Sequence, residues 1–389
     1  MSAGARILGA VDAPQQVLRQ LVLVTGSTRS GTSLAAGTLH HLGMHVPTPM
    51  LKANDSNPAG FFESLWPVKF HNRLLEAALV TATDSRPDAF NLVAGAITPH
   101  ARVELQAWLS TVFDEATSVV VKDPRSMWVP ALWADTAASL DTRIAFLATL
   151  RHPAEVIASR WTYYGSTRPN NDAWRYHIRN LCTWINVNLG TERETRGLPR
   201  VIVRYEAMLE DWRRTMRAVR DALSLDLDPA LDGEDPHPVD DFIEPGLRRH
   251  EPSWDGMDLP ADLVEIAEDA WASLGAIADG EPDPATTESR LDDLAERYRR
   301  IMRVSQAIAA DSTFAFGRQR VKVRVMEIAA SGRGMTTISP IAEGASDPAD
   351  SAGGVGIAVG PGVPSMRRTS RRMRRAFRRW LKRPLTRTA

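Results

Sequence analysis

The stretch V-T-G-S-T-R-S-G-T-S, residues 24–33, constrains the fold of this 389-residue chain more than any other. It follows an apolar run at residues 21–24 and continues into a helical pattern. A glycine-rich turn between a strand and a helix directs backbone N–H groups and the positive end of the helix dipole at one point. The triphosphate-binding pattern G-x-x-x-x-G-K-S/T has a lysine where this chain has Thr32. The stretch therefore predicts an anion-binding loop in which Arg29 supplies the charge.

Four short apolar runs, rich in β-branched residues, predict strands at residues 21–25, 118–121, 144–149 and 201–203. They do not alternate with polar residues, which is typical of strands covered on both faces of a parallel sheet. Between them, apolar residues recur with helical spacing from Trp66 to Ala78 and from Trp174 to Leu189. Strands that alternate with helices predict an α/β fold, with a parallel sheet flanked by helices.

Beyond residue 255 the pattern becomes helical. One helix is expected to start near Asp258 and Pro260, and a second to cover residues 288–310. We expect one domain over residues 1–311 and an extension over 312–339, in which residues 318–325 fit no pattern. Residues 340–365 are rich in Gly, Ala, Ser and Pro and predict a flexible linker. The last segment, residues 366–389, reads as a basic amphipathic tail.

The chain has equal numbers of basic and acidic residues in total, but its C-terminal segment is basic and the rest is acidic. Residues 366–389 hold eleven Arg and Lys and no acid, so the other residues carry 36 basic against 47 acidic side chains. Apolar residues of the tail, among them Phe377 and Trp380, fall on one helical side. Such a helix is typical of segments that bind anionic membrane surfaces. Nucleic-acid binding and a disordered tail that folds back on the acidic body are the alternatives.

A single cysteine, Cys182, excludes an intramolecular disulfide and fits a reducing compartment. Because it lies in a helical pattern, we expect a buried thiol rather than a nucleophile. No run approaches the roughly 20 apolar residues that span a bilayer. These features favour a cytoplasmic protein, peripheral at the inner membrane face if the tail binds lipid.

A second signal, L-R-H-P-A-E-V-I-A-S at residues 150–159, follows the predicted strand at 144–149. Open α/β sheets bind ligands at the carboxyl ends of their strands, which is where Arg151 lies. Together the two segments resemble those of sulfotransferases that use 3′-phosphoadenosine 5′-phosphosulfate (PAPS), of the bacterial, carbohydrate-type branch. In that family the 5′-phosphosulfate loop is often P-K/R-S-G-T-T and the 3′-phosphate motif is R-x-P-x-x-x-x-x-S. The stretches N-P-A-G-F-F-E-S at 57–64, V-K-D-P-R at 121–125 and V-R-Y-E-A-M-L-E-D-W at 203–212 fit it too.

The resemblance covers residues 20–250 and implies a P-loop NTPase-like fold with helical C-terminal elaborations. It implies that Arg151 and Ser159 bind the 3′-phosphate of PAPS and that Tyr205 lies near the nucleotide. The chain departs from the family at Ser27 and Thr28, where many relatives have a proline before the basic residue. The residues implied to hold the 5′-phosphosulfate are Ser27, Thr28, Arg29, Ser30, Gly31, Thr32 and Ser33.

Sulfuryl transfer needs charge stabilisation at the oxygen that leaves and a base for the attacking hydroxyl. Arg29, Lys122 and the start of the helix after Gly31 meet the first need without a metal. Glu63 is the candidate base; its alternative role is a carboxylate that favours a helix start. His71 and His100 are the other candidates, since relatives use a histidine, although the helical spacing of His71 favours a structural role.

The sequence thus predicts a sulfotransferase that uses PAPS and acts on an acceptor hydroxyl. A carbohydrate or glycolipid acceptor is expected, on which Trp161, Trp174 and Trp184 are candidates for stacking. The helical spacing of the last two tryptophans favours core packing instead. Two alternatives stay open at this point: a kinase or NTPase that uses ATP and Mg²⁺, with Asp123 as a metal-binding acid, and a non-enzymatic adaptor that acts through the tail.

Overall fold

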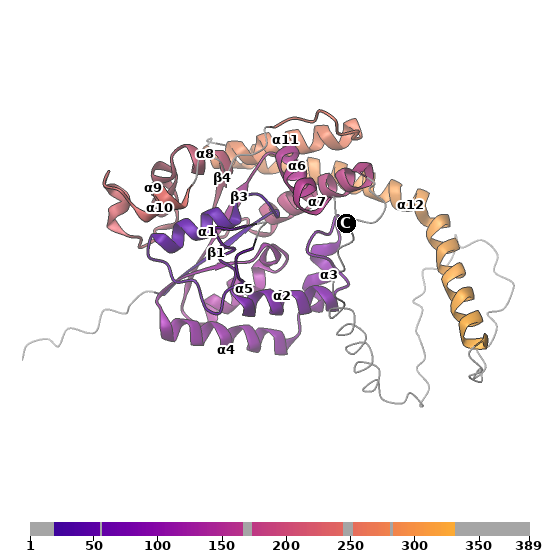
Figure 1. Ribbon diagram of the computed structural model, residues 1–389, viewed down its shortest axis with the longest axis horizontal. Helices are drawn as coiled ribbons and strands as arrows, with labels where there is room; N and C mark the ends of the chain where they lie inside the picture. Colours follow the sequence, from indigo (N-terminus) through magenta and orange to yellow (C-terminus); the bar gives the residue numbers. More distant parts are fainter. Residues whose placement is uncertain (1–18, 55–56, 166–172, 244–251, 281–282, 331–389) are drawn as a thin grey trace, which may run out of the picture. The chain divides into compact units, whose positions relative to one another are not determined.

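The computed structural model describes residues 19–54, 57–165, 173–243, 252–280 and 283–330 (Figure 1). The chain divides into two compact units, Met1–Phe316 and Gly317–Ala389. The sheet, the helices that flank it and the candidate site lie in the first unit. The predicted linker at 340–365 and the basic tail at 366–389 lie outside the described residues.

Four parallel strands form the sheet, in the order β2-β1-β3-β4. Each covers one of the four predicted runs and extends it by one or more residues. The strands are β1 (Gln20–Gly26), β2 (Ser118–Lys122), β3 (Arg143–Leu150) and β4 (Arg200–Arg204). The predicted α/β fold, a parallel sheet flanked by helices, is therefore confirmed.

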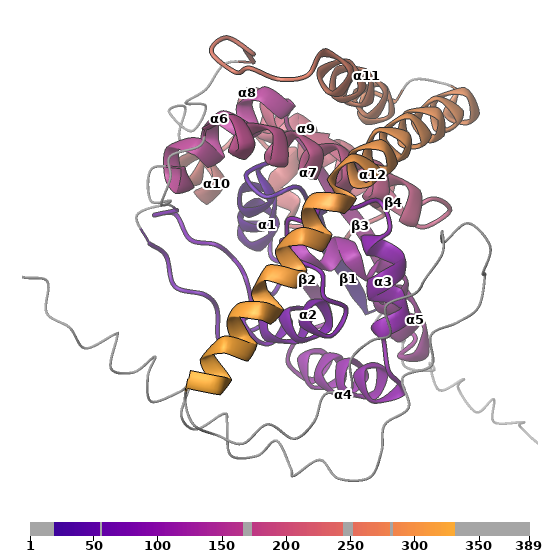
Figure 2. The ribbon, with the colours of Figure 1, turned by 90° about the vertical axis from the view of Figure 1, so that its right-hand side faces the viewer.

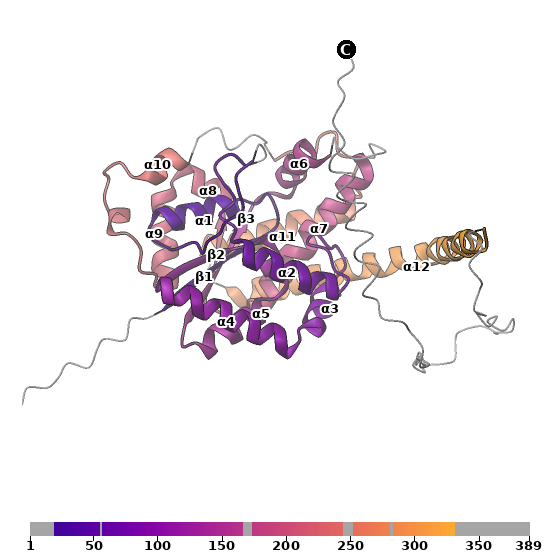
Figure 3. The same cartoon turned by 60° about the horizontal axis from the view of Figure 1, so that its bottom comes forward.

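Helices cover both faces of this sheet, as Figures 1 and 3 show from two directions. In β1, Val22 and Val24 pack under one set of helices and Leu21 and Leu23 under the other, because successive side chains of a strand point to opposite faces. The first set is α1 (Thr32–His41), α8 (Tyr205–Glu210), α9 (Trp212–Leu223) and α10 (Pro238–Phe242). The second is α2 (Leu65–Ala77), α3 (Ala89–Ala96), α4 (Pro99–Glu115) and α5 (Pro130–Ser139).

A third core, beside β3 and β4, is made by the remaining helices. These are α6 (Pro153–Tyr164), α7 (Ala173–Glu194), α11 (Ala261–Ala278) and α12 (Pro284–Ala330). Two short 3₁₀ turns, Pro124–Trp128 and Pro229–Asp232, complete the described elements. The helix expected at 288–310 is thus longer at both ends, and residues 318–325, for which the pattern predicted no element, lie in it as well (Figure 2).

The register of the sheet sets the position of the site. Gly26 at the end of β1 pairs with Thr149 of β3, and Val24 pairs with Lys122, the last residue of β2. Three strands therefore end close together at one edge of the sheet. The loop after β1, the side chain of Lys122 and Arg151 after β3 meet at this edge, where open α/β sheets bind their ligands.

Candidate active site

The loop between β1 and α1 has the backbone of an anion-binding turn. Gly26 and Gly31 have φ angles of 138° and 100°, and Arg29 between them has a φ of 71°. Two features of Gly31 exclude any larger residue at this position. Its φ angle is one that residues with a side chain rarely adopt, and a Cβ atom would lie 2.5 Å from Cδ2 of Tyr205. The first residues of α1 follow directly, so that unbonded N–H groups of the helix start face the loop.

The side chain of Ser30 holds the loop on the sheet. Ser30 Oγ donates to the carbonyl of Ser27 at 2.6 Å and lies 2.7 Å from Thr149 Oγ1 of β3. Ser27 and Ser30 are both buried and do not line the pocket above the loop. Of the loop residues in the sequence prediction, those that line the pocket are Thr28, Arg29, Gly31, Thr32 and Ser33.

Arg151 and Ser159 contact the loop at Arg29. The guanidinium of Arg151 donates through Nη1 to the carbonyl of Arg29 at 3.3 Å and lies 4.2 Å from the ring centroid of Tyr205. Its Nε donates to Glu155 at 2.9 Å, while its Nη2 is buried and has no hydrogen-bond partner among the described residues. Arg29 Nε donates to Ser159 Oγ at 3.1 Å. The four residues predicted around the nucleotide, Arg29, Arg151, Ser159 and Tyr205, thus lie together.

Lys122 and Glu63 form a buried ion pair at the other end of the loop. Lys122 Nζ is 2.6 Å from Glu63 Oε1 and donates to Ser33 Oγ at 3.2 Å. The two charged side chains are only 3% and 8% exposed, so each depends on the other for charge compensation. Arg125 Nη1 lies 3.9 Å from the second carboxylate oxygen of Glu63. Lys122 is therefore a buried residue of the site and not a lysine on the surface.

Asp123 lies behind this pair and is held by Arg125 and by His71 of α2. Burial alone would raise the pKa of Asp123, but a hydrogen bond from His71 Nδ1 at 2.8 Å and the charge of Arg125 lower it to about 2. His71 Nε2 accepts a hydrogen bond from Trp133 at 3.0 Å. Both ring nitrogens of His71 are therefore occupied inside the core, and its role is structural.

A pocket of about 570 Å³ connects the two ends of the loop. Lys122, Arg125 and Arg151 line it together with Arg29, so cationic side chains outnumber carboxylates in its lining. Among the described residues that line it, Glu63 is the one carboxylate and no histidine occurs. His100 lies exposed on α4, away from this lining. Of the three candidate bases, Glu63 is thus the one in the pocket.

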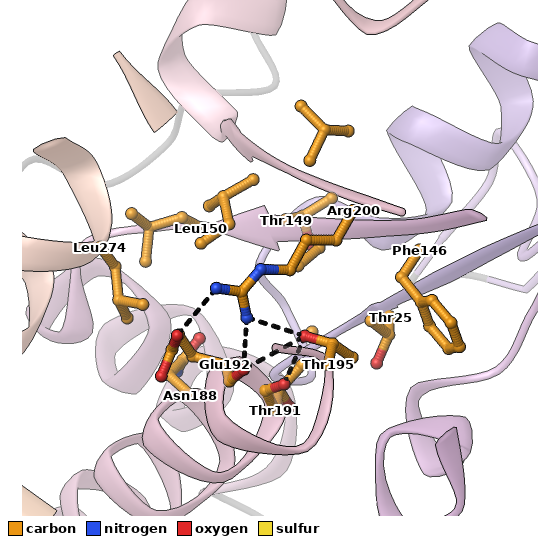
Figure 4. Close-up of a pocket in the computed structure, with 14 residues that line it drawn as sticks. Thr25, Phe146, Thr149, Leu150, Asn188, Thr191, Glu192, Thr195, Arg200 and Leu274 are labelled. Carbon is orange, nitrogen blue, oxygen red and sulfur yellow. Dashed lines mark hydrogen bonds and ion pairs between the residues drawn. The ribbon is translucent and has the colours of Figure 1, made fainter. Parts of the chain in front are cut away.

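A second cavity lies on the other side of the sheet edge, between β1, β3, β4 and α7. Figure 4 shows Arg200 directed at Glu192 and Thr195 beside it, and Arg200 Nη2 donates to Glu192 Oε1 at 2.9 Å. The cavity measures about 20 Å³, which is room for about one water molecule. It has no space for a substrate, and its charges are already paired.

Arg125, Asn57 and Arg160 were not predicted as site residues, although Arg125 and Asn57 lie inside two of the motifs noted in the sequence. Arg125 follows Lys122 in V-K-D-P-R, and Asn57 begins N-P-A-G-F-F-E-S; both line the pocket. Arg160 follows Ser159, and its Nη1 donates to Thr28 Oγ1 of the loop. Their position beside predicted site residues could have indicated a role in the site. Their partners could not be predicted, because they lie on distant segments of the chain.

The predicted burial of three further side chains is confirmed for Cys182 and Trp184 but not for Trp174. Cys182 is buried as expected, and burial raises the pKa of its thiol to about 11. Trp184 is buried in the core, whereas Trp174 is 51% exposed, so the prediction of core packing for Trp174 is wrong. Trp174 lies in the first turn of α7, where the stripe has not yet entered the core.

The described residues contain no group of three or more His, Cys, Asp or Glu side chains arranged to hold a metal ion. No helix among them is both long and apolar enough to cross a membrane.

Comparisons with solved structures find sulfotransferase domains. The sulfotransferase domain of the olefin synthase of Synechococcus PCC 7002 is 17% identical, covers 75% of this chain and 98% of that domain, and has a TM-score of 0.35. The sulfotransferase domain from the curacin biosynthetic pathway is 16% identical, covers 66% and 98%, and has a TM-score of 0.38. No protein-family model and no curated protein sequence matches the chain. Similarity at this level assigns no activity, so a function has to follow from the residues of the site.

Proposed function

We propose that this protein is a sulfotransferase that moves a sulfuryl group from PAPS to an acceptor hydroxyl. The observation that carries the proposal is the pair of cationic sites on one loop. Lys122 contacts the loop at Ser33, and Arg151 contacts it at Arg29, with a buried Nη2 that has no partner among the described residues. A ligand with two separate anionic groups fits such a pocket, and PAPS carries a phosphosulfate and a 3′-phosphate.

The residues of the pocket fit PAPS in their donor types. The loop N–H groups, Arg29 and the hydroxyls of Thr32 and Ser33 would hold the phosphosulfate. Arg151 and Ser159 would hold the 3′-phosphate, for which the Arg151 Nη2 group is the donor in need of an acceptor. An unpaired buried donor costs about 1–3 kcal/mol, and a bound phosphate oxygen would remove that cost.

Glu63 and Lys122 supply the two functions that the transfer needs. PAPS supplies a sulfur atom whose bond to the 5′-phosphate oxygen breaks as the acceptor oxygen attacks. Glu63, as the carboxylate of the pocket, accepts the proton of the acceptor hydroxyl. Lys122 then faces a neutral acid 2.6 Å away instead of an anion, so its charge becomes available to the oxygen that leaves. The buried ion pair thus couples removal of the proton to stabilisation of the leaving group.

The hydroxyl of Ser33 favours this proposal over a kinase or NTPase. Its position matches the Ser or Thr that binds Mg²⁺ in triphosphate-binding loops. Here Ser33 Oγ accepts hydrogen bonds from Lys122 Nζ and from Asn57 Nδ2, each at 3.2 Å. These donors occupy both lone pairs, and an ammonium group at this distance repels a divalent cation bound to the same oxygen.

A comparison of ligands, followed by a transfer assay, tests the proposed function. Adenosine 3′,5′-bisphosphate should raise the unfolding temperature in the presence of a chelator, and by more than ATP does with Mg²⁺. Radiolabelled sulfate should then pass from PAPS to an alcohol, glycan or lipid fraction. Stabilisation by Mg²⁺-ATP alone, with no transfer of label, would instead support the kinase or NTPase.

The acceptor prediction, a carbohydrate or glycolipid, stays a prediction. We further propose that residues 366–389, with eleven basic side chains and no acid, bind anionic membrane surfaces where a lipid-linked acceptor is found. Sedimentation with phosphatidylglycerol vesicles should capture the full chain but not a chain that lacks residues 366–389. Equal capture of both, or capture by nucleic acid alone, would contradict this proposal.

A further inference from the structure

A flap formed by residues 50–54 and 57–64 contributes Glu63 to the pocket, and its Asn57 side chain bonds to the start of α1. Its base is closed by a bridge between Met50 and Ser64 and by a hydrogen bond of 2.7 Å from Leu51 N to the carbonyl of Glu63. Nearer its tip, Asn57 Nδ2 donates to Ser33 Oγ at 3.2 Å. The flap that bears the candidate base is thereby joined to the start of α1.

The amide of Asn57 can have only one orientation. Its Nδ2 lies 2.6 Å from the carbonyl oxygen of Gly60, which can only accept a hydrogen bond, so the amide nitrogen has to face it. The second hydrogen of this nitrogen is the one donated to Ser33. Asn57 therefore acts on Ser33 as a donor and leaves the Ser33 oxygen as acceptor.

Ser33 Oγ also accepts from Lys122 Nζ at 3.2 Å, so both of its lone pairs are used. Its own hydrogen is then the group left to donate. Among the described residues, no acceptor for this hydrogen is present within hydrogen-bond distance, and Ser33 lines the pocket. The hydrogen is therefore available to an anionic oxygen of a ligand in the pocket.

We propose that Asn57 is a positioning residue for sulfuryl transfer. It fixes the hydroxyl of Ser33 as a hydrogen-bond donor to the phosphosulfate, and it holds the flap with Glu63 at a set distance from the loop. This inference rests on the proposed function. Lys122 bonds to both Ser33 and Glu63, so Asn57 closes a chain of groups that links the candidate base to the donor site.

A double-mutant cycle of Asn57→Ala and Ser33→Ala, measured by kcat for transfer, tests the inference. Each single change should lower kcat by about 10- to 100-fold, somewhat less than the about 100- to 1,000-fold known for loss of a direct transition-state donor. If Asn57 acts through Ser33, the double variant should be little slower than either single variant. Losses that multiply would overturn the proposal, because they would mean that Asn57 does not act through Ser33.

Matched variants separate positioning from folding. Asn57→Asp keeps the size of the side chain but presents acceptors to Ser33, so it should lower kcat at least as far as Asn57→Ala does. Asn91→Ala, which changes an exposed asparagine of α3, should leave kcat within about twofold. The affinity for adenosine 3′,5′-bisphosphate, which has no sulfuryl group, should stay within about twofold in the Asn57 variants, and a larger loss would contradict the assigned role.

Absence of transfer in the unchanged protein would count against the proposed function itself, whereas normal transfer with an additive cycle would count against this inference alone.

Discussion

The replacement Arg151→Lys should reduce the preference of the protein for a nucleotide with a 3′-phosphate. Lysine keeps a positive charge beside Glu155, which lies 2.9 Å from Arg151 Nε, but it removes the buried Nη2 group. A hydrogen bond to a charged group contributes about 1.5–3 kcal/mol, and loss of the smaller value is about a tenfold change in affinity. We therefore expect the affinity ratio between adenosine 3′,5′-bisphosphate and adenosine 5′-monophosphate to fall by about tenfold or more.

Truncation to alanine would test the same contact less well, because it also removes the partner of a buried carboxylate. The side chains of Arg151 and Glu155 are 6% and 2% exposed, and loss of one member of a buried pair costs about 3–5 kcal/mol. The combination of Arg151→Ala with Glu155→Gln should recover most of that stability without recovering the preference for the bisphosphate. The two measurements thus separate folding from binding.

Isothermal titration calorimetry at fixed ionic strength gives the two dissociation constants for each variant. Arg102→Lys is the matched control, since Arg102 pairs with Asp135 on the surface, where both side chains are at least half exposed. The control should leave the affinity ratio unchanged. If Arg151→Lys folds normally and also leaves the ratio unchanged, Arg151 does not bind the 3′-phosphate and the reasoning about its Nη2 group is refuted.

Three further predictions concern the base, the thiol and a buried carboxylate. Glu63→Gln should lower kcat by about 100- to 10,000-fold while bisphosphate binding stays within about twofold; equal kcat would exclude Glu63 as the base. The thiol of Cys182, whose pKa is raised to about 11, should react with a disulfide reagent only after unfolding, and rapid reaction of the folded protein would contradict its burial. The pKa of Asp123 is depressed to about 2, so its contribution, about 2 kcal/mol, should be present above pH 4 and lost as the pH falls through 2. Urea unfolding should therefore show a weaker dependence on pH in this range for Asp123→Asn than for the unchanged protein.

Local patterns were sufficient to predict the strands and the loop, because each of those features is encoded within a few consecutive residues. The buried runs at β1 to β4 have no polar alternation, and Gly26 and Gly31 mark two of the three positions where the turn has a positive φ angle; Arg29 is the third. Trp174 shows the limit of this reasoning. Its spacing matches the apolar stripe of α7, but the helix start at Ala173 leaves the residue half exposed.

The partners within the site could not be predicted, because they join segments that are far apart in the sequence. Lys122 meets Glu63 across 59 residues, and Arg29 meets Ser159 across 130. A sequence pattern places Glu63 before a helix and Lys122 after a strand, but it does not contain the distance between them. The helical spacing of His71 favoured its structural role, but its two partners, Asp123 and Trp133, lie 52 and 62 residues further along the chain and could not be predicted.

The lysine that the loop lacks after Gly31 shows how the fold replaces a missing local residue. Thr32 occupies that position, and the ammonium group that reaches Ser33 comes instead from Lys122 of β2. The contact between Lys122 and Ser33 depends on the pairing of Val24 with Lys122, because a shift of the strand by one residue would turn the Lys122 side chain to the opposite face of the sheet. A lysine within the loop would place its charge at the helix start, whereas Lys122 brings its charge together with the carboxylate of Glu63. The loop therefore gains a cation that is already paired with a carboxylate, and under the proposed function such a pair suits the transfer of a group to a hydroxyl better than the binding of a metal–triphosphate complex.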